Sequence, residues 1–270
     1  MFKNYKIGFI GAGTMGKAII GGLINSGFIL KDEIIASEIS QNAAEKVSSK
    51  IGIVTTLDNN ELVEKSDIIV LCVKPHIVKT ILESVKKSLS SDKLLISIAA
   101  GVSTSFIEEI LDKQVPVIRI MPNTPALVGE GMSVICKGKY TSEKQMEYAG
   151  ELFSKVGRCL EIDEKYINAV TGISGSGPAF MYLIIEALAD GGVKLGLPKQ
   201  KAIELAAQTA LGAAKMVIET GKHPSVLKDE VTTPGGTTIA GLIVMEDNKI
   251  RAALAHTVEA AAKRAEDLAG

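Results

Sequence analysis

Over residues 1–163, short runs of β-branched and other apolar residues alternate with stretches whose apolar positions recur at helical spacing. The first run, residues 5–10, is followed by a helix that we expect at residues 14–26. Further strands are expected at residues 33–36, 51–55, 67–71, 93–98, 115–120, 132–136 and 159–162. Runs that are apolar throughout, such as residues 68–73, are typical of parallel strands covered by helices on both faces. The pattern predicts an α/β fold with an N-terminal Rossmann-type, doubly wound sheet.

From residue 164 onward the pattern is helical, with no convincing strand, and the residues are mostly Ala, Leu, Glu and Lys. Helices are expected at residues 165–195, with an interruption at 172–178, and then at 199–220, 225–231, 238–247 and 250–268. We therefore divide the chain into a dinucleotide-binding domain, residues 1–163, and an all-helical domain, residues 164–270.

Several helices of the second domain are apolar on more than one face. The apolar residues that exceed what one thin helical layer needs are Leu183, Ile184, Leu188, Ile203, Leu205, Ala206, Leu211, Met216 and Val217. Such a surplus indicates a subunit interface. An internal core could take up the same residues.

The composition and the first residues of the chain indicate in which cellular compartment the protein is expected. Of the 270 residues, 46% are hydrophobic and 23% charged, and no continuous apolar run approaches the roughly 20 residues that cross a bilayer. The first residues lead directly into a strand pattern, without the charged start and cleavage site of a secretory signal. We expect a soluble, cytoplasmic protein that does not bind a membrane.

The charged residues and cysteines argue against a nucleic-acid-binding protein and against a disulfide framework or a metal site. Thirty Lys and Arg oppose 31 Asp and Glu, for a net charge of −1, and no basic block is present, so nucleic acid is not an expected partner. The three cysteines Cys72, Cys136 and Cys159 are odd in number and widely spaced. They indicate buried thiols, with neither a disulfide framework nor a metal site.

A glycine-rich loop lies between the first expected strand and the first expected helix. In a GxGxxG sequence at this place, the first glycine allows a tight turn, the second lets the backbone approach a pyrophosphate, and the third lets helix and strand pack closely. The amides of the helix N-terminus then face the phosphates. The residues expected to bind the cofactor here are Ile10, Gly11, Ala12, Gly13, Thr14 and Met15.

The second strand ends in Ser37 and Glu38. An acidic residue about 20 positions after the glycines is where the 2′-hydroxyl of NAD is usually bound, so Glu38 favours NAD. No Arg follows to hold a 2′-phosphate, yet Ser37, Ser40 or Lys46 could accommodate one. The alternative for Glu38 is a solvated loop charge.

Two further strand ends should border the cofactor, because ligands of open α/β sheets lie outside the carboxyl ends of the strands. One carries Val73, Lys74 and Pro75, and the other carries Ala99 and Ala100. Lys74 could equally be an ordinary surface charge. His76 begins a helix and is not expected to be catalytic.

The helical domain holds a segment rich in threonine and glycine, residues 232–238. Adjacent glycines followed by threonines leave amides and hydroxyls free at the start of the next helix, which suits a carboxylate. Thr237 and Thr238 could also donate protons to a substrate nitrogen. The alternative is a glycine-rich turn with a capping threonine. A second glycine-rich run, residues 172–178, allows either tight helix packing or a ligand.

Along nearly its whole length the sequence resembles the pyrroline-5-carboxylate reductases. The motifs that carry the resemblance are Phe9-Ile10-Gly11-Ala12-Gly13, Val73-Lys74-Pro75-His76, Ala99-Ala100-Gly101-Val102, Met121-Pro122-Asn123-Thr124-Pro125, the runs at 172–179 and 189–198, and Pro234-Gly235-Gly236-Thr237-Thr238. The resemblance implies hydride transfer from NADPH or NADH to the C=N carbon of 1-pyrroline-5-carboxylate, giving L-proline. It also implies a homodimer formed by the helical domain, often within a larger ring.

The resemblance also assigns residues. Thr233, Gly236 and Thr237 would hold the substrate carboxylate, and the Thr238 hydroxyl would face the ring nitrogen as the one catalytic group. The cofactor would be lined by Ser37, Asn59, Val73, Lys74, Pro75, Ala99 and Ala100. Gly221 stands where some members of the family have an acidic residue near the substrate, which puts that role in doubt.

Two other functions are compatible with a Rossmann domain followed by helices. A 3-hydroxyacid dehydrogenase carries a catalytic Lys in its interdomain helix, but the corresponding positions here are Met181 and, for its Asn, Ile185. A non-catalytic nucleotide sensor would not need the intact segment 235–238. A protonated imine is already an electrophile, so positioning and electrostatics can reduce it without a dedicated acid.

Overall fold

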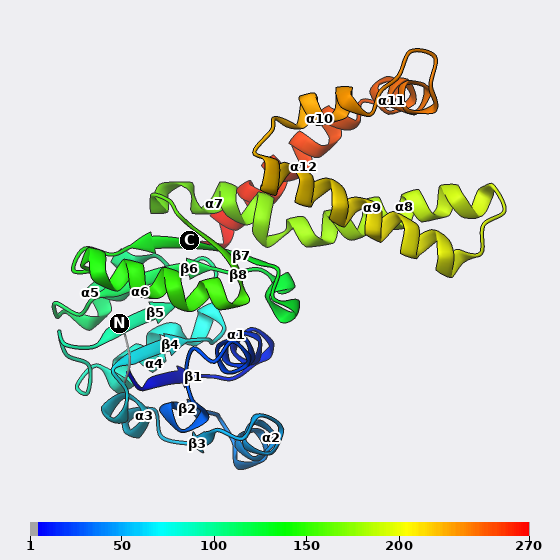
Figure 1. Ribbon diagram of the computed structural model, residues 1–270. Helices are drawn as coiled ribbons and strands as arrows, with labels where there is room; N and C mark the ends of the chain where they lie inside the picture. The colour runs from blue at the N-terminus through cyan, green and yellow to red at the C-terminus, as the bar shows by residue number, and fades with distance from the viewer. Residues whose placement is uncertain (1–4, 270) are drawn as a thin grey trace. The chain divides into compact units, whose positions relative to one another are not determined.

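The structure is a computed structural model that describes residues 5–269. One sheet of eight strands has the order β3-β2-β1-β4-β5-β6-β7-β8 (Figure 1). Neighbouring strands from β3 through β6 pair in parallel, β7 is antiparallel to β6, and β8 is parallel to β7. The strands are β1 Ile7–Ile10, β2 Ile34–Ser37, β3 Val54–Thr56, β4 Ile68–Leu71, β5 Leu94–Ser97, β6 Val117–Met121, β7 Gly131–Lys137 and β8 Gly157–Glu161.

Helices cover both faces of the sheet and form two separate cores. One core joins alternate strand residues such as Phe9 and Val70 to α1, α2 and α6. The other joins the intervening residues, such as Ile69 and Leu71, to α3, α4 and α5. The doubly wound sheet predicted from the sequence is therefore confirmed. These helices are α1 Thr14–Asn25, α2 Gln41–Ile51, α3 Asn59–Lys65, α4 Val78–Val85, α5 Thr104–Leu111 and α6 Glu143–Phe153.

One strand lies later in the chain than we expected. β3 covers Val54–Thr56 instead of residues 51–55, because Ile51 is the last residue of α2. Gly52 ends that helix with φ of +81°, a left-handed conformation that glycine adopts at little cost.

The chain divides into two compact units, the first comprising residues 5–175 and 261–269 of the described chain and the second residues 176–260. After the sheet, the first unit continues through α7 Ile167–Val170 and a π-helix at Thr171–Gly175. The remaining helices are α8 Gly177–Lys194, α9 Lys199–Thr220, α10 Pro224–Glu230, α11 Thr237–Asp247 and α12 Ile250–Ala269.

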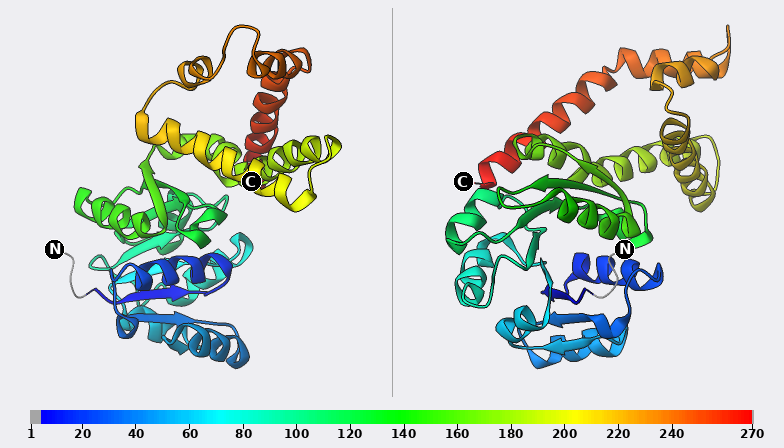
Figure 2. Two further views of the ribbon diagram at one scale, coloured as in Figure 1. Left: turned by 45° about the vertical axis from the view of Figure 1, so that its right-hand side comes forward. Right: turned by 60° about the vertical axis from the view of Figure 1, so that its left-hand side comes forward.

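Within the second unit, α8 and α9 lie side by side (Figure 2). Their shared core is small: Ala189, Ala202 and Ala206 are buried, with Ile185 packed against them. The approach is close, since a Cβ on Gly192 would lie 3.4 Å from the Ala202 Cβ.

Most of the surplus apolar residues of these helices stay exposed within the single chain. Of the nine noted above, Ala206 alone is buried, Ile184 and Val217 are partly buried, and the other six are exposed. By length and composition, the helical stretch Glu164–Lys194 could even cross a membrane, and only 11% of its most apolar window is buried. An internal core thus does not account for this apolar surface.

Candidate functional site

The glycine-rich loop lies where four strand ends meet at one edge of the sheet. The Cys72 amide, just after β4, donates to the Ile10 carbonyl at 2.9 Å, and the Gly11 amide donates to the Ser37 carbonyl at 3.0 Å. The Ile98 amide, just after β5, donates to the Leu71 carbonyl at 3.2 Å. In the order β3-β2-β1-β4, the chain leaves β1 toward one face and β4 toward the other, and the crevice at such a switch point is where ligands of open α/β sheets bind.

Each glycine of the loop has the geometry that its predicted role requires. Gly11 has φ of +86°, and a Cβ there would lie 2.9 Å from the Cys72 carbonyl oxygen. A Cβ on Gly16 would lie 2.9 Å from the Gly11 carbonyl oxygen, so these two glycines are needed for packing. A Cβ on Gly13 would instead meet nothing within 4 Å. Gly13 therefore faces open space into which a phosphate can come.

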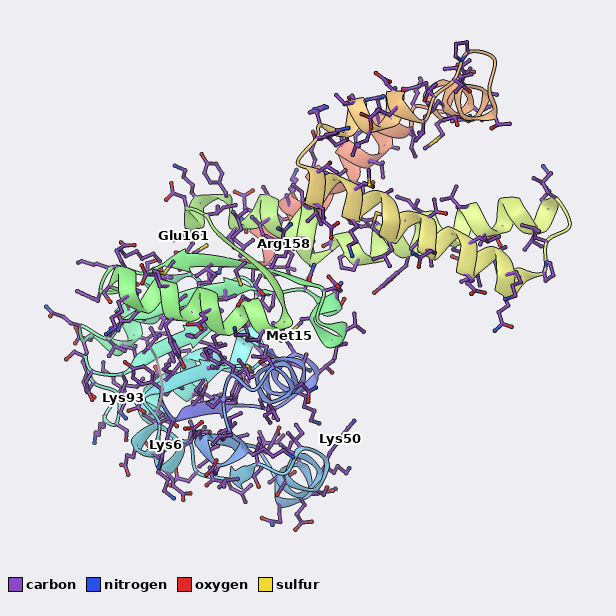
Figure 3. The ribbon with its side chains drawn as sticks, viewed as in Figure 1. Lys6, Met15, Lys50, Lys93, Arg158 and Glu161 are labelled. Atoms are coloured by element: carbon purple, nitrogen blue, oxygen red, sulfur yellow. The ribbon has the colours of Figure 1, made fainter. Side chains whose placement is uncertain are left out.

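The N-terminus of α1 supplies donors at the same place. Its N-cap is Gly13, which makes no side-chain capping bond, so amides of the first turn are free to bind an anion. Thr14 and Met15 belong to this turn, and Met15 is labelled in Figure 3. The side chains of Ile10 and Ala12 are buried, so these two residues can offer only backbone atoms to a cofactor.

The end of β2 brings together three of the predicted cofactor residues and links one of them to the loop. The Ser37 hydroxyl donates to the Asn59 side-chain oxygen at 2.6 Å. The Glu38 carboxylate accepts the Ala12 amide at 2.8 Å. Glu38 is thus held against the loop and is not a freely solvated charge.

The ends of β4 and β5 carry the other predicted cofactor residues. A Cβ on Gly11 would lie 3.1 Å from Val73 Cγ1, so Val73 borders the loop. Lys74 and Pro75 are exposed, and Ala99 is buried while Ala100 is exposed. For Lys74, no salt bridge is formed within the described residues.

The threonine and glycine segment of the second unit forms a turn that opens a helix. The Gly236 amide donates to the Thr233 carbonyl at 3.0 Å, and Gly235 has φ of +66°. Gly236 is the N-cap of α11 and has no side chain with which to cap it. α11 begins at Thr237, one residue before the expected start.

The hydroxyls in this turn are available to a ligand. Among the described residues, the side chains of Thr233, Thr237 and Thr238 make no hydrogen bond. Thr237 is exposed and Thr238 is partly buried. The first turn of α11 reads Thr237-Thr238-Ile239-Ala240, so its amides and the positive end of the helix dipole meet no acidic side chain there.

Sequence reasoning missed a buried ionic cluster in the first unit. Arg119 on β6, whose side chain is 7% exposed, pairs with Glu164 at 2.9 Å. The same carboxylate accepts the Thr104 amide at 2.9 Å and the Thr104 hydroxyl at 2.5 Å. The lone Arg within an apolar strand was a signal that a distant acidic partner must exist.

The cysteines do not supply a nucleophile. Burial raises the pKa of the Cys136 thiol and that of the Cys159 thiol to about 11 each, and it raises the pKa of Cys72 further. A thiol with such a pKa is protonated at neutral pH and is a poor nucleophile.

Comparisons with known proteins cover both units. A family model described as pyrroline-5-carboxylate reductase dimerisation matches residues 164–268, and one described as NADP oxidoreductase, coenzyme F420-dependent, matches residues 6–101. Pyrroline-5-carboxylate reductases of Methanosarcina acetivorans and Arabidopsis thaliana are each 46% identical over 98% of this chain, and the matches cover 98% and 96% of those proteins.

Solved structures of pyrroline-5-carboxylate reductases are also similar to this chain over nearly its whole length. The Coxiella burnetii pyrroline-5-carboxylate reductase has a TM-score of 0.93 at 37% identity, with 98% of each chain covered. The Plasmodium falciparum pyrroline carboxylate reductase, solved with NADP bound, has a TM-score of 0.89 at 36% identity, with 100% of each chain covered.

Proposed function

The chain belongs to the pyrroline-5-carboxylate reductase family, and from this premise we propose how its own residues carry out the reaction. The reaction is hydride transfer from NADPH or NADH to the C=N carbon of 1-pyrroline-5-carboxylate, which gives L-proline and is the last step of proline biosynthesis. The bound cofactor supplies the hydride. The protein has to hold the two molecules, orient them and exclude water.

The cofactor pyrophosphate is held by backbone atoms of the glycine-rich loop and by the amides at the start of α1. The residues that supply them are Ile10, Gly11, Ala12, Gly13, Thr14 and Met15. The observation that supports this most strongly is the open space at Gly13, next to a helix N-terminus without a cap. The ribose side is lined by Ser37, Glu38 and Asn59: Ser37 is hydrogen-bonded to Asn59, and Glu38 accepts the Ala12 amide. Val73, Lys74, Pro75, Ala99 and Ala100 line the nicotinamide side.

Glu38 decides how well a 2′-phosphate is tolerated. The family model and the P. falciparum relative support NADP, yet a carboxylate beside the 2′-position repels a phosphate and accepts a hydroxyl. We therefore propose that this chain uses NADH as well as NADPH, and that Glu38 lowers its affinity for NADPH.

The substrate carboxylate lies at the start of α11, held by Thr233, Gly236 and Thr237. Free amides and the helix dipole favour an anion there, and the side chains of Thr233 and Thr237, which have no hydrogen-bond partner among the described residues, add hydroxyl donors. Thr238 faces the ring nitrogen. Because a protonated imine already attracts the hydride, the Thr238 hydroxyl orients the nitrogen, and it donates a proton only to an imine that arrives unprotonated.

The exposed apolar helices form the interface of a homodimer. The family model described as pyrroline-5-carboxylate reductase dimerisation matches the helical part of the chain. Most apolar side chains on α8, α9 and α11 are exposed within the single chain. We propose that this surface faces a second copy and not a membrane, and that dimers assemble into a larger ring in the cytoplasm without nucleic acid. The domain division that we propose stays at residues 1–163 and 164–270, the second being the substrate-binding and dimerisation domain.

The function is tested by oxidation of NADPH and of NADH by the purified protein, with 1-pyrroline-5-carboxylate or with small β-keto acids. We expect oxidation with the imine and formation of proline in equal amount. Turnover with keto acids alone would instead indicate a 3-hydroxyacid dehydrogenase, although Met181 stands where that enzyme needs its Lys. Cofactor binding without any turnover would indicate a nucleotide sensor.

A further inference from the structure

Asn123 joins three parts of the first unit with one side chain. It lies two residues after the end of β6, and its Oδ1 accepts the amide of Met132, on β7, at 2.8 Å. Its Nδ2 donates to the Ser174 carbonyl at 3.1 Å and lies 3.4 Å from the Ser174 hydroxyl oxygen. Both ends of the amide are therefore engaged by the protein, so Asn123 is not free to bind a substrate.

The Ser174 carbonyl needs a donor from outside its own helix. In an α-helix it would accept the amide of residue 178, but residue 178 is Pro and has no N–H. The amide one residue further on, that of Ala179, donates to the Ser176 carbonyl at 3.1 Å. The Asn123 side chain supplies the donor that Pro178 cannot.

The turn that receives this bond is unusual and tightly placed. Residues Thr171–Gly175 form a π-helix, a widened turn that is frequent at functional sites. A Cβ on Gly175 would lie only 2.9 Å from the Met121 Cε, so the turn lies directly against the end of β6. Because Asn123 donates to the Ser174 carbonyl, any displacement of the Asn123 side chain acts on this turn.

The turn is the last part of the first unit before the chain enters the second, which begins at Ser176. Under the proposed function, on which this inference rests, the cofactor residues precede this junction and the substrate residues follow it. We infer that Asn123 is a positioning residue for hydride transfer: it holds the π-helical turn at Thr171–Gly175 against the end of β6.

Hydride transfer is sensitive to such a constraint, because the reacting atoms must be held about 3–3.5 Å apart and a misplacement of about 1 Å can cost about 100-fold in rate. Loss of the constraint should lower the rate of the chemical step. It should leave cofactor affinity almost unchanged, because Asn123 does not need to touch the cofactor.

The test uses Asn123→Ala and Asn123→Asp in the full-length protein. Ala removes both bonds, whereas Asp keeps an acceptor for the Met132 amide and loses the donor for Ser174. We expect both variants to lower kcat by roughly 10- to 100-fold. The primary deuterium isotope effect, measured with NADPH deuterated at the transferred position, should rise because hydride transfer becomes rate-limiting. The Kd for NADPH should stay close to that of the wild type.

Thr141→Val is the matched control. The buried Thr141 hydroxyl donates to the Val117 carbonyl, at the other end of β6, at 2.7 Å. This control should lose stability while keeping the wild-type kcat and isotope effect.

Three results would overturn the inference. An isotope effect and a kcat per folded molecule equal to those of the wild type would make Asn123 merely structural. A loss of NADPH affinity as large as the loss of kcat would make it a cofactor contact. Wild-type behaviour of Asn123→Asp would show that the donor to Ser174 does not matter. Absence of wild-type turnover with the imine would refute the proposed function instead, so the two failures are distinguishable.

Discussion

Replacing Gly13 with Ala should separate cofactor binding from stability. The Gly13 backbone has φ of −67° and ψ of −162°, an extended conformation that alanine can adopt. Its new methyl group would have no heavy atom within 4 Å, so the free energy of unfolding should change by no more than about 0.5 kcal/mol. The methyl group would occupy the space through which the pyrophosphate must approach.

The expected loss of affinity follows from the donors at the start of α1. If the phosphate is held back from one amide, a charge-assisted hydrogen bond of about 1.5–3 kcal/mol is lost, which corresponds to a roughly 10- to 100-fold higher Kd. The Kd can be measured from the fluorescence change of NADPH on binding, and the stability from the unfolding midpoint in urea.

Gly21→Ala is the control for this comparison. Gly21 lies on the same helix, and a Cβ there would also meet nothing within 4 Å. Alanine within a helix is favoured over glycine by about 0.5–1 kcal/mol, so this variant should be slightly more stable and bind NADPH normally. An unchanged Kd in Gly13→Ala would refute the close approach of the pyrophosphate. A large loss of stability would refute our interpretation that Gly13 is needed for cofactor binding and not for packing.

Three further substitutions test other parts of the site. Thr238→Ala should lower kcat by roughly 10-fold or more with an unchanged Kd for NADPH; unchanged turnover would remove Thr238 from the mechanism. Glu38→Ser should raise kcat/KM for NADPH relative to NADH by about tenfold, or ~1.4 kcal/mol, and a constant ratio would show that Glu38 does not select the cofactor. Glu164→Ala leaves the buried Arg119 without its carboxylate and should lower the free energy of unfolding by about 3 kcal/mol; a urea midpoint equal to that of the wild type would contradict this.

The sequence predicted the sheet and the glycine-rich loop well, because both depend on neighbouring residues. Apolar runs such as that of β4 are typical of strands that helices cover on both faces. Of the loop glycines, Gly11 has φ of +86°, which glycine adopts at little cost, and Gly16 has no room for a Cβ. The start of β3 was predicted too early because an apolar residue such as Ile51 fits the end of a helix as well as a strand.

Features that depend on distant partners could not be found in this way. Arg119 and Glu164 are 45 residues apart, and Asn123 and Ser174 are 51 apart. Each pair exists only because β6 lies next to the chain that follows β8. Local sequence patterns give only two hints of such pairs. One is the charged Arg119 within an apolar strand, and the other is Pro178, which has no N–H to donate to the Ser174 carbonyl four residues earlier.

The two halves of the proposed site limit the function in different ways. A switch point with a glycine-rich loop binds a dinucleotide whatever is reduced, so the first unit alone supports no more than a nicotinamide-dependent enzyme. We propose that the choice of substrate depends on the start of α11, where free amides and hydroxyls suit a carboxylate, and on Met181, which cannot protonate a carbonyl oxygen as a Lys would. An imine that carries a carboxylate and arrives already protonated needs no such Lys. The chemistry of the second unit therefore points to an imine, and the family resemblance adds which imine it is.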